Sequence, residues 1–149
     1  MINTHITQGG MRPLVVLFGP TASGKTSLGV DLANHIGGEV VNVDSRQLYR
    51  EMPIITAMPT NEEQAGAPHH LYEVLDVSEK CDAIKYAGMA KSVCEDIWAR
   101  GKVPILLGGT GFYIQSLLEG LSPIPAAQDG LGDQLMLRDS ADLYAELQD

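Results

Sequence analysis

The 149-residue chain is long enough for one folded domain, and its 44% hydrophobic content suffices for a single core. The net charge is −9 and the ten Lys and Arg residues are scattered. This argues against a protein that binds nucleic acid unaided, because such proteins present a basic surface. Apolar runs are only strand-length and the N-terminus lacks signal-peptide features, so we expect no membrane span and no secretion. Two cysteines without CxxC spacing make a reducing cytoplasm the simplest compartment.

The first predicted element is a strand that leads into a glycine-rich loop. Residues 1–12 are polar and are predicted to form a disordered leader, and the apolar run 14–18 is the first buried strand. GPTASGKT at residues 19–26 then matches GxxxxGK[ST]. Between a strand and a helix, such a loop turns its backbone N–H groups inward and binds phosphate; the alternative is a chance glycine-rich turn. The predicted phosphate-binding residues are Gly19, Pro20, Thr21, Ala22, Ser23, Gly24, Lys25 and Thr26.

The next elements predict a parallel α/β sheet. Lys25 would add a positive charge to the loop and Thr26 a hydroxyl for Mg²⁺. From Lys25 apolar residues recur at helical spacing until the glycine pair at 37–38, and 39–43 is a second strand. A strand, a helix and a second strand joined by such short connections imply a right-handed crossover between two parallel strands. This is the start of a doubly wound sheet.

The segment DSRQLY at residues 44–49 follows the second strand. In open parallel sheets ligands bind beyond the carboxyl ends of the strands, so Asp44 is predicted to share one rim with the phosphate loop. The alternative is that Asp44 only caps a helical turn that contains Gln47. On this segment alone the two interpretations are equally good.

The middle of the chain is a long polar connection with three prolines, residues 50–70, which is typical of a lid or binding segment. His69 and His70 are adjacent and would point to opposite faces of a strand, which favours packing or a ligand contact over a shared metal ion. Residues 71–75 are predicted to be a third strand. It ends at Asp76, at a position that often supports Mg²⁺ in such folds.

The last regular elements are predicted from residue 83 onwards. Residues 83–100 form an amphipathic helix whose apolar face includes Cys94 and Trp98, which we therefore assign to the core. Strand 103–107 precedes GGTGFY at 108–113, which is either a second ligand-approaching loop with the Thr110 hydroxyl or a tight turn into a helix through Leu118. After Gly120 a linker is expected. A helical pattern resumes only near Leu143 and stops at Asp149, as in a truncated protein.

The three loops in this order closely resemble the bacterial tRNA dimethylallyltransferase (tRNA isopentenyltransferase) family, and PHHL at 68–71 and LDVSE at 75–79 agree. The resemblance covers about residues 13–123. It implies a P-loop NTPase-like α/β core over 13–122, a parallel sheet flanked by helices. Residues 123–149 would be a linker and the start of an incomplete helical segment, truncated before the helical insertion domain of the family.

The resemblance also implies the reaction. A dimethylallyl group would pass from dimethylallyl diphosphate to N6 of the adenosine 3′ to the anticodon, in tRNAs that read codons beginning with U, with Mg²⁺ as cofactor. Asp44 would accept the proton of the N6 amine, and Thr21 and Lys25 would act at the diphosphate. The target base must be flipped out of the anticodon loop. The residues implied to contact tRNA are Asp44, Ser45, Arg46, Gln47 and Thr110.

Some features depart from the family pattern. Met58 stands where the family usually has Lys, and Phe112 replaces a usual Leu. Family members are about twice as long, so the basic surface that grips tRNA would lie in sequence absent here. We expect a monomer whose partners are the tRNA anticodon loop and dimethylallyl diphosphate. Alternatives are a small-molecule or nucleotide kinase, since the loop also suits ATP, or a non-catalytic phosphate-binding fragment.

Overall fold

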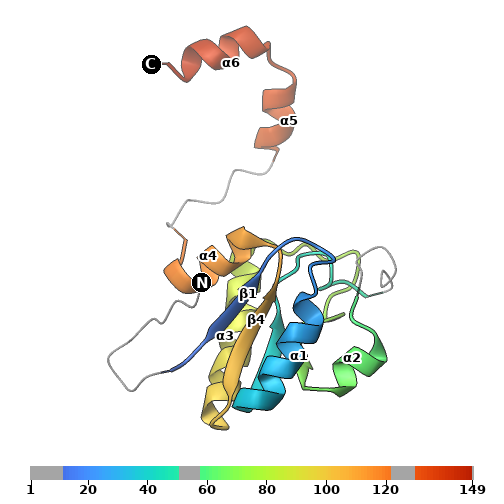
Figure 1. The fold of residues 1–149 in the computed structure, drawn as a ribbon. Helices are drawn as coiled ribbons and strands as arrows, with labels where there is room; N and C mark the ends of the chain where they lie inside the picture. The colour runs from blue at the N-terminus through green and yellow to red at the C-terminus, as the bar shows by residue number, and fades with distance from the viewer. Residues whose placement is uncertain (1–11, 51–57, 122–129, 149) are drawn as a thin grey trace.

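The computed structural model describes residues 12–50, 58–121 and 130–148, and these residues contain one four-stranded parallel sheet (Figure 1). The strand order is β1-β4-β2-β3, and every neighbouring pair is parallel. The strands are β1 (Val15–Phe18), β2 (Gly38–Asn42), β3 (His69–His70) and β4 (Val103–Gly108). The predicted α/β class with a parallel sheet flanked by helices is confirmed.

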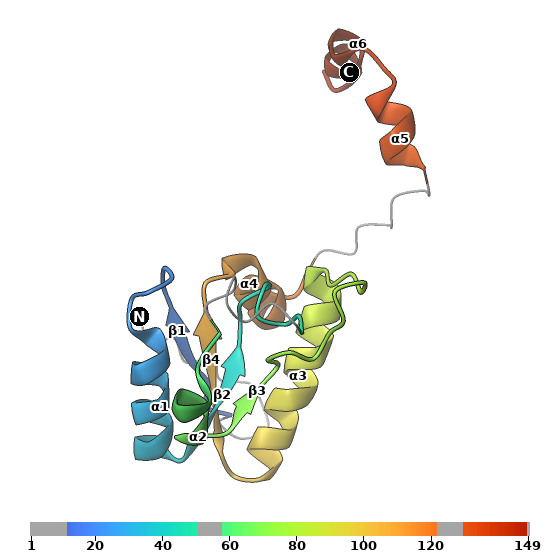
Figure 2. The same ribbon diagram turned by 90° about the vertical axis from the view of Figure 1, so that its right-hand side faces the viewer.

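Helices cover both faces of the sheet because its central strands are apolar on both sides. In Figure 2, α1 (Lys25–Ile36) and α3 (Ala83–Ala99) lie on opposite sides of the strands. Successive β4 residues alternate accordingly: Ile105 and Leu107 pack in the cluster under α1, and Leu106 packs in the cluster under α3. On the α3 side, α4 (Gly111–Glu119) joins the core through the buried Tyr113, which stacks on Tyr86 with ring centroids 4.2 Å apart.

The helix and strand limits follow the sequence prediction for most of the core. Helix α1 ends at Gly37, whose φ of 67° is the left-handed conformation that glycine adopts without strain. Cys94 is buried, and burial raises the pKa of its thiol to about 12, as expected for a core residue rather than a reactive one. Trp98 is half-buried against the same cluster, and its indole N–H donates to the Pro13 carbonyl at 2.8 Å.

The third strand was wrongly placed. It is His69–His70 rather than residues 71–75, where the only ladder contact is an isolated bridge between Tyr49 and Leu75. Leu71 and Glu73 have φ values of 62° and 50°, which take the backbone out of the extended conformation. The prediction failed because Leu71 and Leu75 are both buried, so the segment has the apolar pattern of a strand without its backbone geometry.

Two short helices were not predicted. Within the connection 50–70, α2 (Asn61–Ala65) begins at a capping box formed by Thr60 and Glu63. Within the expected linker lies α5 (Leu131–Met136), and α6 (Ser140–Glu146) follows it where a helical pattern near Leu143 was predicted; neither helix contains a buried residue. Residues 1–11 of the expected leader and 122–129 of the linker lie outside the described residues, so the proposed domain limits stay predictions. None of the helices in the described ranges is long and apolar enough to cross a membrane.

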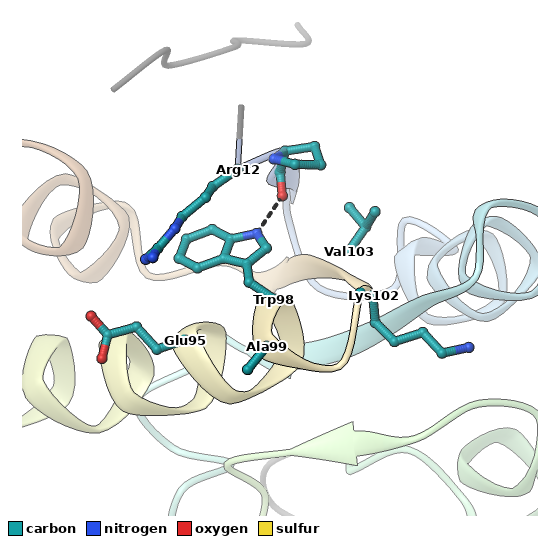
Figure 3. Close-up of a pocket in the computed structure, with 8 residues that line it drawn as sticks. Arg12, Glu95, Trp98, Ala99, Lys102 and Val103 are labelled. Carbon is teal, nitrogen blue, oxygen red and sulfur yellow. Dashed lines mark hydrogen bonds between the residues drawn. The ribbon is translucent and has the colours of Figure 1, made fainter. Parts of the chain in front are cut away.

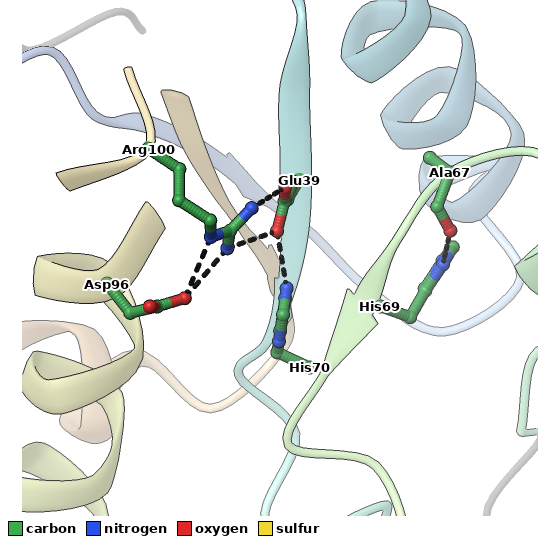
Figure 4. Close-up of polar contacts among 6 residues, drawn as sticks. All are labelled: Glu39, Ala67, His69, His70, Asp96 and Arg100. Carbon is green, nitrogen blue, oxygen red and sulfur yellow. Dashed lines mark hydrogen bonds and ion pairs between the residues drawn. The ribbon is translucent and has the colours of Figure 1, made fainter. Parts of the chain in front are cut away.

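The amino end of the sheet carries an ion-pair network around one buried carboxylate, that of Glu39 (Figure 4). Glu39 of β2 is 4% exposed and accepts hydrogen bonds from Arg100 (Nη2 to Oε2, 2.8 Å) and contacts His70 Nε2 at 2.7 Å. Arg100 also binds Asp96 at 2.8 Å. The Arg100 guanidinium is the main cause that lowers the pKa of Glu39 to about 2. His69 points away from this network and contacts the Ala67 carbonyl at 2.7 Å, and the described residues contain no metal-binding cluster. The two histidines therefore pack separately, as the sequence favoured.

Candidate active site

A cleft of about 290 Å³ lies at the carboxyl ends of β1, β2 and β4. This is the edge at which open parallel sheets bind ligands. The phosphate loop, the turn after β2, the glycines after β4 and the segment before α2 all contribute to its walls. It is lined by Gly19, Thr21, Ala22, Ser23, Gly24, Lys25, Thr26, Ser27, Asp44, Gln47, Met58, Pro59, Glu63, Leu107, Gly108 and Gly109.

The phosphate loop has the backbone geometry that the motif predicts. Gly24 and Ala22 have φ values of 78° and 61°, so the chain turns through left-handed positions just before α1. Helix α1 begins without a side-chain cap and without an acidic residue in its first turn. Its first N–H groups therefore have no side-chain competitor at the cleft, which suits an anion.

Lys25 is held by its own loop. The Nζ ammonium donates to the Pro20 carbonyl and to the Ser23 hydroxyl, the latter at 3.3 Å. The side chain therefore lies along the loop, at the wall of the cleft. Pro20 contributes its carbonyl to this arrangement and does not line the cleft itself.

Asp44 caps a turn and also lines the cleft. Its Oδ1 accepts a hydrogen bond from the Arg46 backbone N–H at 2.9 Å, as in the capping interpretation. Its backbone is fixed by Asn42, whose side chain accepts from Asp44 N at 2.9 Å and donates to the Asp44 and Leu71 carbonyls. The two interpretations of this residue are therefore compatible, because the residue whose carboxylate caps the turn also lines the cleft with the phosphate loop.

The β4 loop packs directly on the turn that carries Asp44. A Cβ atom on Gly108 would lie 2.4 Å from the Val43 carbonyl, so only glycine allows the two backbones to approach this closely. The Thr110 N–H donates to the Val43 carbonyl at 3.0 Å, and the Thr110 hydroxyl accepts from Ser45 N at 3.1 Å. These contacts fix the position of the turn relative to β4.

The fourth wall comes from the segment Met58–Glu63. The Glu63 carboxylate accepts from Thr60 N at 2.8 Å while the Thr60 hydroxyl accepts from Glu63 N at 3.2 Å. Gln64 then donates to the Pro59 carbonyl at 2.9 Å, and Gly66 lies so close to Val30 that a Cβ there would be 2.5 Å from its Cγ1. The wall is thus a folded segment that packs on α1.

The structure brings most of the predicted site residues together. Apart from Pro20, the phosphate-loop residues line the cleft, and so do Asp44 and Gln47. Three predicted tRNA-contacting residues do not line the cleft: Ser45, Arg46 and Thr110. The Ser45 N–H donates a hydrogen bond to the Thr110 hydroxyl, and Arg46 is exposed. Asp76 also lies outside it and accepts from the Ser78 N–H and hydroxyl instead.

Sequence reasoning missed Glu63 as a cleft residue. The signal was present, since Thr60 followed three residues later by Glu63 is a capping-box pattern that starts a helix. It would have placed a folded element, rather than a loop, beside the phosphate loop.

A larger cavity of about 490 Å³ lies at the opposite end of the sheet (Figure 3). Its residues precede β1, end α3 and begin β4, so it lies at the amino ends of the strands. The Arg12 guanidinium lies 5.5 Å above the Trp98 ring, and Lys102 and Glu95 flank it. No motif of the sequence reaches this cavity, and the chemistry points to the smaller cleft.

Comparisons with known proteins show the family of this chain. The family model described as IPP transferase matches residues 47–149, and one described as Isopentenyl transferase matches residues 12–73. The first match covers more than half of the chain. The chain belongs to the IPP transferase family.

Relatives in this family share about half of the aligned residues. The chain is 51% identical over 115 residues to a tRNA dimethylallyltransferase of Parvibaculum lavamentivorans, which covers 77% of this chain and 37% of that protein. It is 47% identical over 139 residues to a tRNA dimethylallyltransferase of Methylococcus capsulatus, with 91% and 45% covered. The chain thus spans about two fifths of the length of the curated relatives it matches.

Solved structures of the family have the same fold. The full-length tRNA isopentenylpyrophosphate transferase of Bacillus halodurans superposes with a TM-score of 0.73 at 38% identity, over 91% of this chain and 46% of that one. A eukaryotic dimethylallyltransferase acting on tRNA gives a TM-score of 0.75 at 34% identity, over 90% and 35%.

Proposed function

We propose that this chain forms the diphosphate-binding and catalytic face of a tRNA dimethylallyltransferase. The reaction would transfer a dimethylallyl group from dimethylallyl diphosphate to N6 of the adenosine 3′ to the anticodon, in tRNAs that read codons beginning with U. The observation that carries the proposal is that Asp44 and the phosphate loop line one cleft. A proton acceptor and a leaving-group site must open on the same cleft for an amine to attack an allylic diphosphate.

The phosphate loop would stabilise the leaving group. Negative charge builds up on the diphosphate as the allylic C–O bond breaks, and preorganised donors around it lower the barrier. The donors in this chain are the N–H groups from Ala22 to the start of α1, the Lys25 ammonium and the Thr21 hydroxyl. Positive charge builds up on the allyl carbon at the same time, so a nearby carboxylate such as Asp44 is favourable there.

Asp44 would accept the proton of the nucleophile. The exocyclic N6 amine of adenine is a weak nucleophile, and loss of its proton as the N–C bond forms makes the new bond stable. Gln47 lines the same cleft and offers both a donor and an acceptor, which suits an adenine edge. The base would have to leave the anticodon stack to reach this depth.

The residues of the cleft fit Mg²⁺ bound together with the diphosphate. Mg²⁺ takes oxygen ligands and is usually held by few protein groups plus substrate phosphates. The cleft offers hydroxyls and carboxylates and no His or Cys among its described residues. Thr26 is the residue that would hold the ion through its hydroxyl, and the ion would supply neutralising charge to the diphosphate.

The proposal is tested by incubating the chain with labelled dimethylallyl diphosphate, Mg²⁺ and unmodified tRNA, beside a reaction with ATP and no tRNA. Label in the tRNA that disappears in Asp44→Asn supports the proposal. Phosphoryl transfer from ATP without prenylation would contradict it and favour a kinase. Binding of dimethylallyl diphosphate without either reaction would leave a phosphate-binding fragment.

A further inference from the structure

The charges of the cleft do not match a free diphosphate. Among the described residues that line it, Lys25 is the cation and Asp44 and Glu63 are the anions. Lys25 is also partly engaged by Pro20 and Ser23. A diphosphate that enters without a counter-ion therefore meets more negative than positive side-chain charge.

Glu63 is fixed at the wall by local structure. The capping box binds its Oε2 to Thr60 N at 2.8 Å, and α2 packs on α1 through Gly66 and Val30. The carboxylate is exposed, so solvent screens its field, but it is not free to swing away from the cleft without breaking the cap.

The Tyr72 hydroxyl lies within the electrostatic fields of both carboxylates. Its hydroxyl oxygen is buried without a hydrogen-bond partner among the described residues. Burial raises the pKa of Tyr72, and the negative charges of Asp44 and Glu63 raise it further. The fields of the two carboxylates therefore reach the same buried hydroxyl, although Asp44 follows β2 and Glu63 lies in α2.

We propose that Glu63 makes diphosphate binding in this cleft conditional on a divalent cation. Its carboxylate repels the free diphosphate more strongly than the complex in which Mg²⁺ neutralises part of the negative charge, so the residue selects the metal-bound form of the ligand. The inference rests on the proposed function in one respect: the cleft must bind a diphosphate.

The capping box makes a clean substitution available. Gln at the third helical position accepts the same backbone hydrogen bond as Glu, so Glu63→Gln removes the charge and keeps the cap. Glu62→Gln is the matched control, because Glu62 is the neighbouring exposed residue of the same helix turn and does not line the cleft. Glu63→Ala removes both charge and cap and reports the structural part of the effect.

The test is calorimetric titration of the full chain with inorganic pyrophosphate, once with Mg²⁺ and once with EDTA. The measured quantity is the ratio of the two dissociation constants for each variant. We expect Glu63→Gln to bind about tenfold more tightly in EDTA and to show a ratio about tenfold smaller than the wild type. The ratio for Glu62→Gln should stay within about twofold of the wild-type ratio. Added salt should reduce the difference between Glu63→Gln and the wild type.

Two outcomes would overturn the inference, and they are distinguishable. Equal ratios in the wild type and Glu63→Gln, with the wild type binding pyrophosphate, would show that Glu63 only caps α2 and would leave the proposed function standing. Absence of pyrophosphate binding by the wild type in Mg²⁺ would overturn both proposals. Glu63→Ala should show the same ratio of dissociation constants as Glu63→Gln but a lower melting temperature. This result would separate the effect of the charge on binding from the effect of the cap on stability.

Discussion

Asp44 combines an observed capping hydrogen bond with a proposed catalytic role, and a substitution can separate the two. Its Oδ1 accepts from Arg46 N, and an Asn side chain offers an oxygen at the same place. Asp44→Asn should therefore keep the turn and the melting temperature but lose prenyl transfer by about 10²–10⁴-fold, because the amide cannot take up the N6 proton. Thermal unfolding and label transfer to tRNA check the two halves. Full activity in this variant would remove Asp44 from the proposed mechanism.

Gly108 is the tightest backbone contact of the site. Gly108→Ala should destabilise the fold by about 2–3 kcal/mol and weaken pyrophosphate binding, because the new methyl group would overlap the Val43 carbonyl at 2.4 Å. Gly109→Ala is the control. Its Cβ would lie 3.4 Å from the Gly19 carbonyl, so a small adjustment should suffice. Denaturant titration of both variants measures the difference in their free energies of unfolding. Equal free energies would mean that β4 and the Asp44 turn can move apart without destabilising the fold.

At the residue scale the sequence located much of the cleft and missed its fourth wall. The phosphate loop can be predicted from the sequence because the backbone conformation of the loop requires particular residues at particular positions. Asp44 can be predicted because it directly follows a strand. The roles of Ser45 and Thr110 are different. Their mutual bond depends on β4 lying beside β2, which no local pattern of either segment contains.

The Glu39–Arg100 pair links β2 to the end of α3 and makes the fold sensitive to acid. The pKa of Glu39 is lowered from its ordinary value of 4.5 to about 2, chiefly by Arg100. A carboxyl with a lowered folded-state pKa stabilises the fold above its unfolded pKa and loses this as pH falls through the folded one. The free energy of unfolding should therefore fall by about 2–3 kcal/mol between pH 4.5 and 2 through this residue.

Urea unfolding at a series of pH values checks this prediction. In Glu39→Gln the free energy of unfolding should change less steeply with pH over that range than it does in the wild type. Glu62→Gln, an exposed acidic residue elsewhere, should keep the wild-type slope. An unchanged slope in Glu39→Gln would show that other carboxylates govern acid unfolding.

At the element scale, buried amphipathic elements were predictable and short irregular ones were not. Helices α1, α3 and α4 and strands β1, β2 and β4 have apolar patterns long enough to define their period. Residues 71–75 show the limit of this rule, because Leu71 and Leu75 are buried in a segment whose backbone is not extended. Helix α2 is only five residues long and depends on its cap, and α5 has no buried face to give it a pattern.

At the scale of the whole molecule, some exposed apolar side chains belong to β1 or to the helices that follow β1 and β4, and others belong to the segment of α5 and α6. Among the described residues β1 has a neighbour on one side only, and Phe18, Phe112 and Leu28 are 60%, 59% and 56% exposed. A strand edge beside apolar side chains favours pairing between copies, whereas a net charge of −9 opposes it.

We therefore expect the chain to be monomeric at low ionic strength and to associate as salt screens the repulsion. Sedimentation velocity at low and high salt measures this, and Phe112→Lys should reduce the association. Monomers at both ionic strengths would show that the edge of β1 is protected. The same experiment tests the monomer expected from the sequence.

The position of Lys25 affects how every affinity for this cleft should be interpreted. Its ammonium already has oxygen partners on Pro20 and Ser23, so an incoming anion does not gain an unsolvated charge but replaces one set of oxygens with another. The measured binding energy is then the difference between two well-solvated arrangements of the same lysine. Weakening the resting arrangement, for instance by removing the Ser23 hydroxyl, would strengthen anion binding without adding any contact to the ligand.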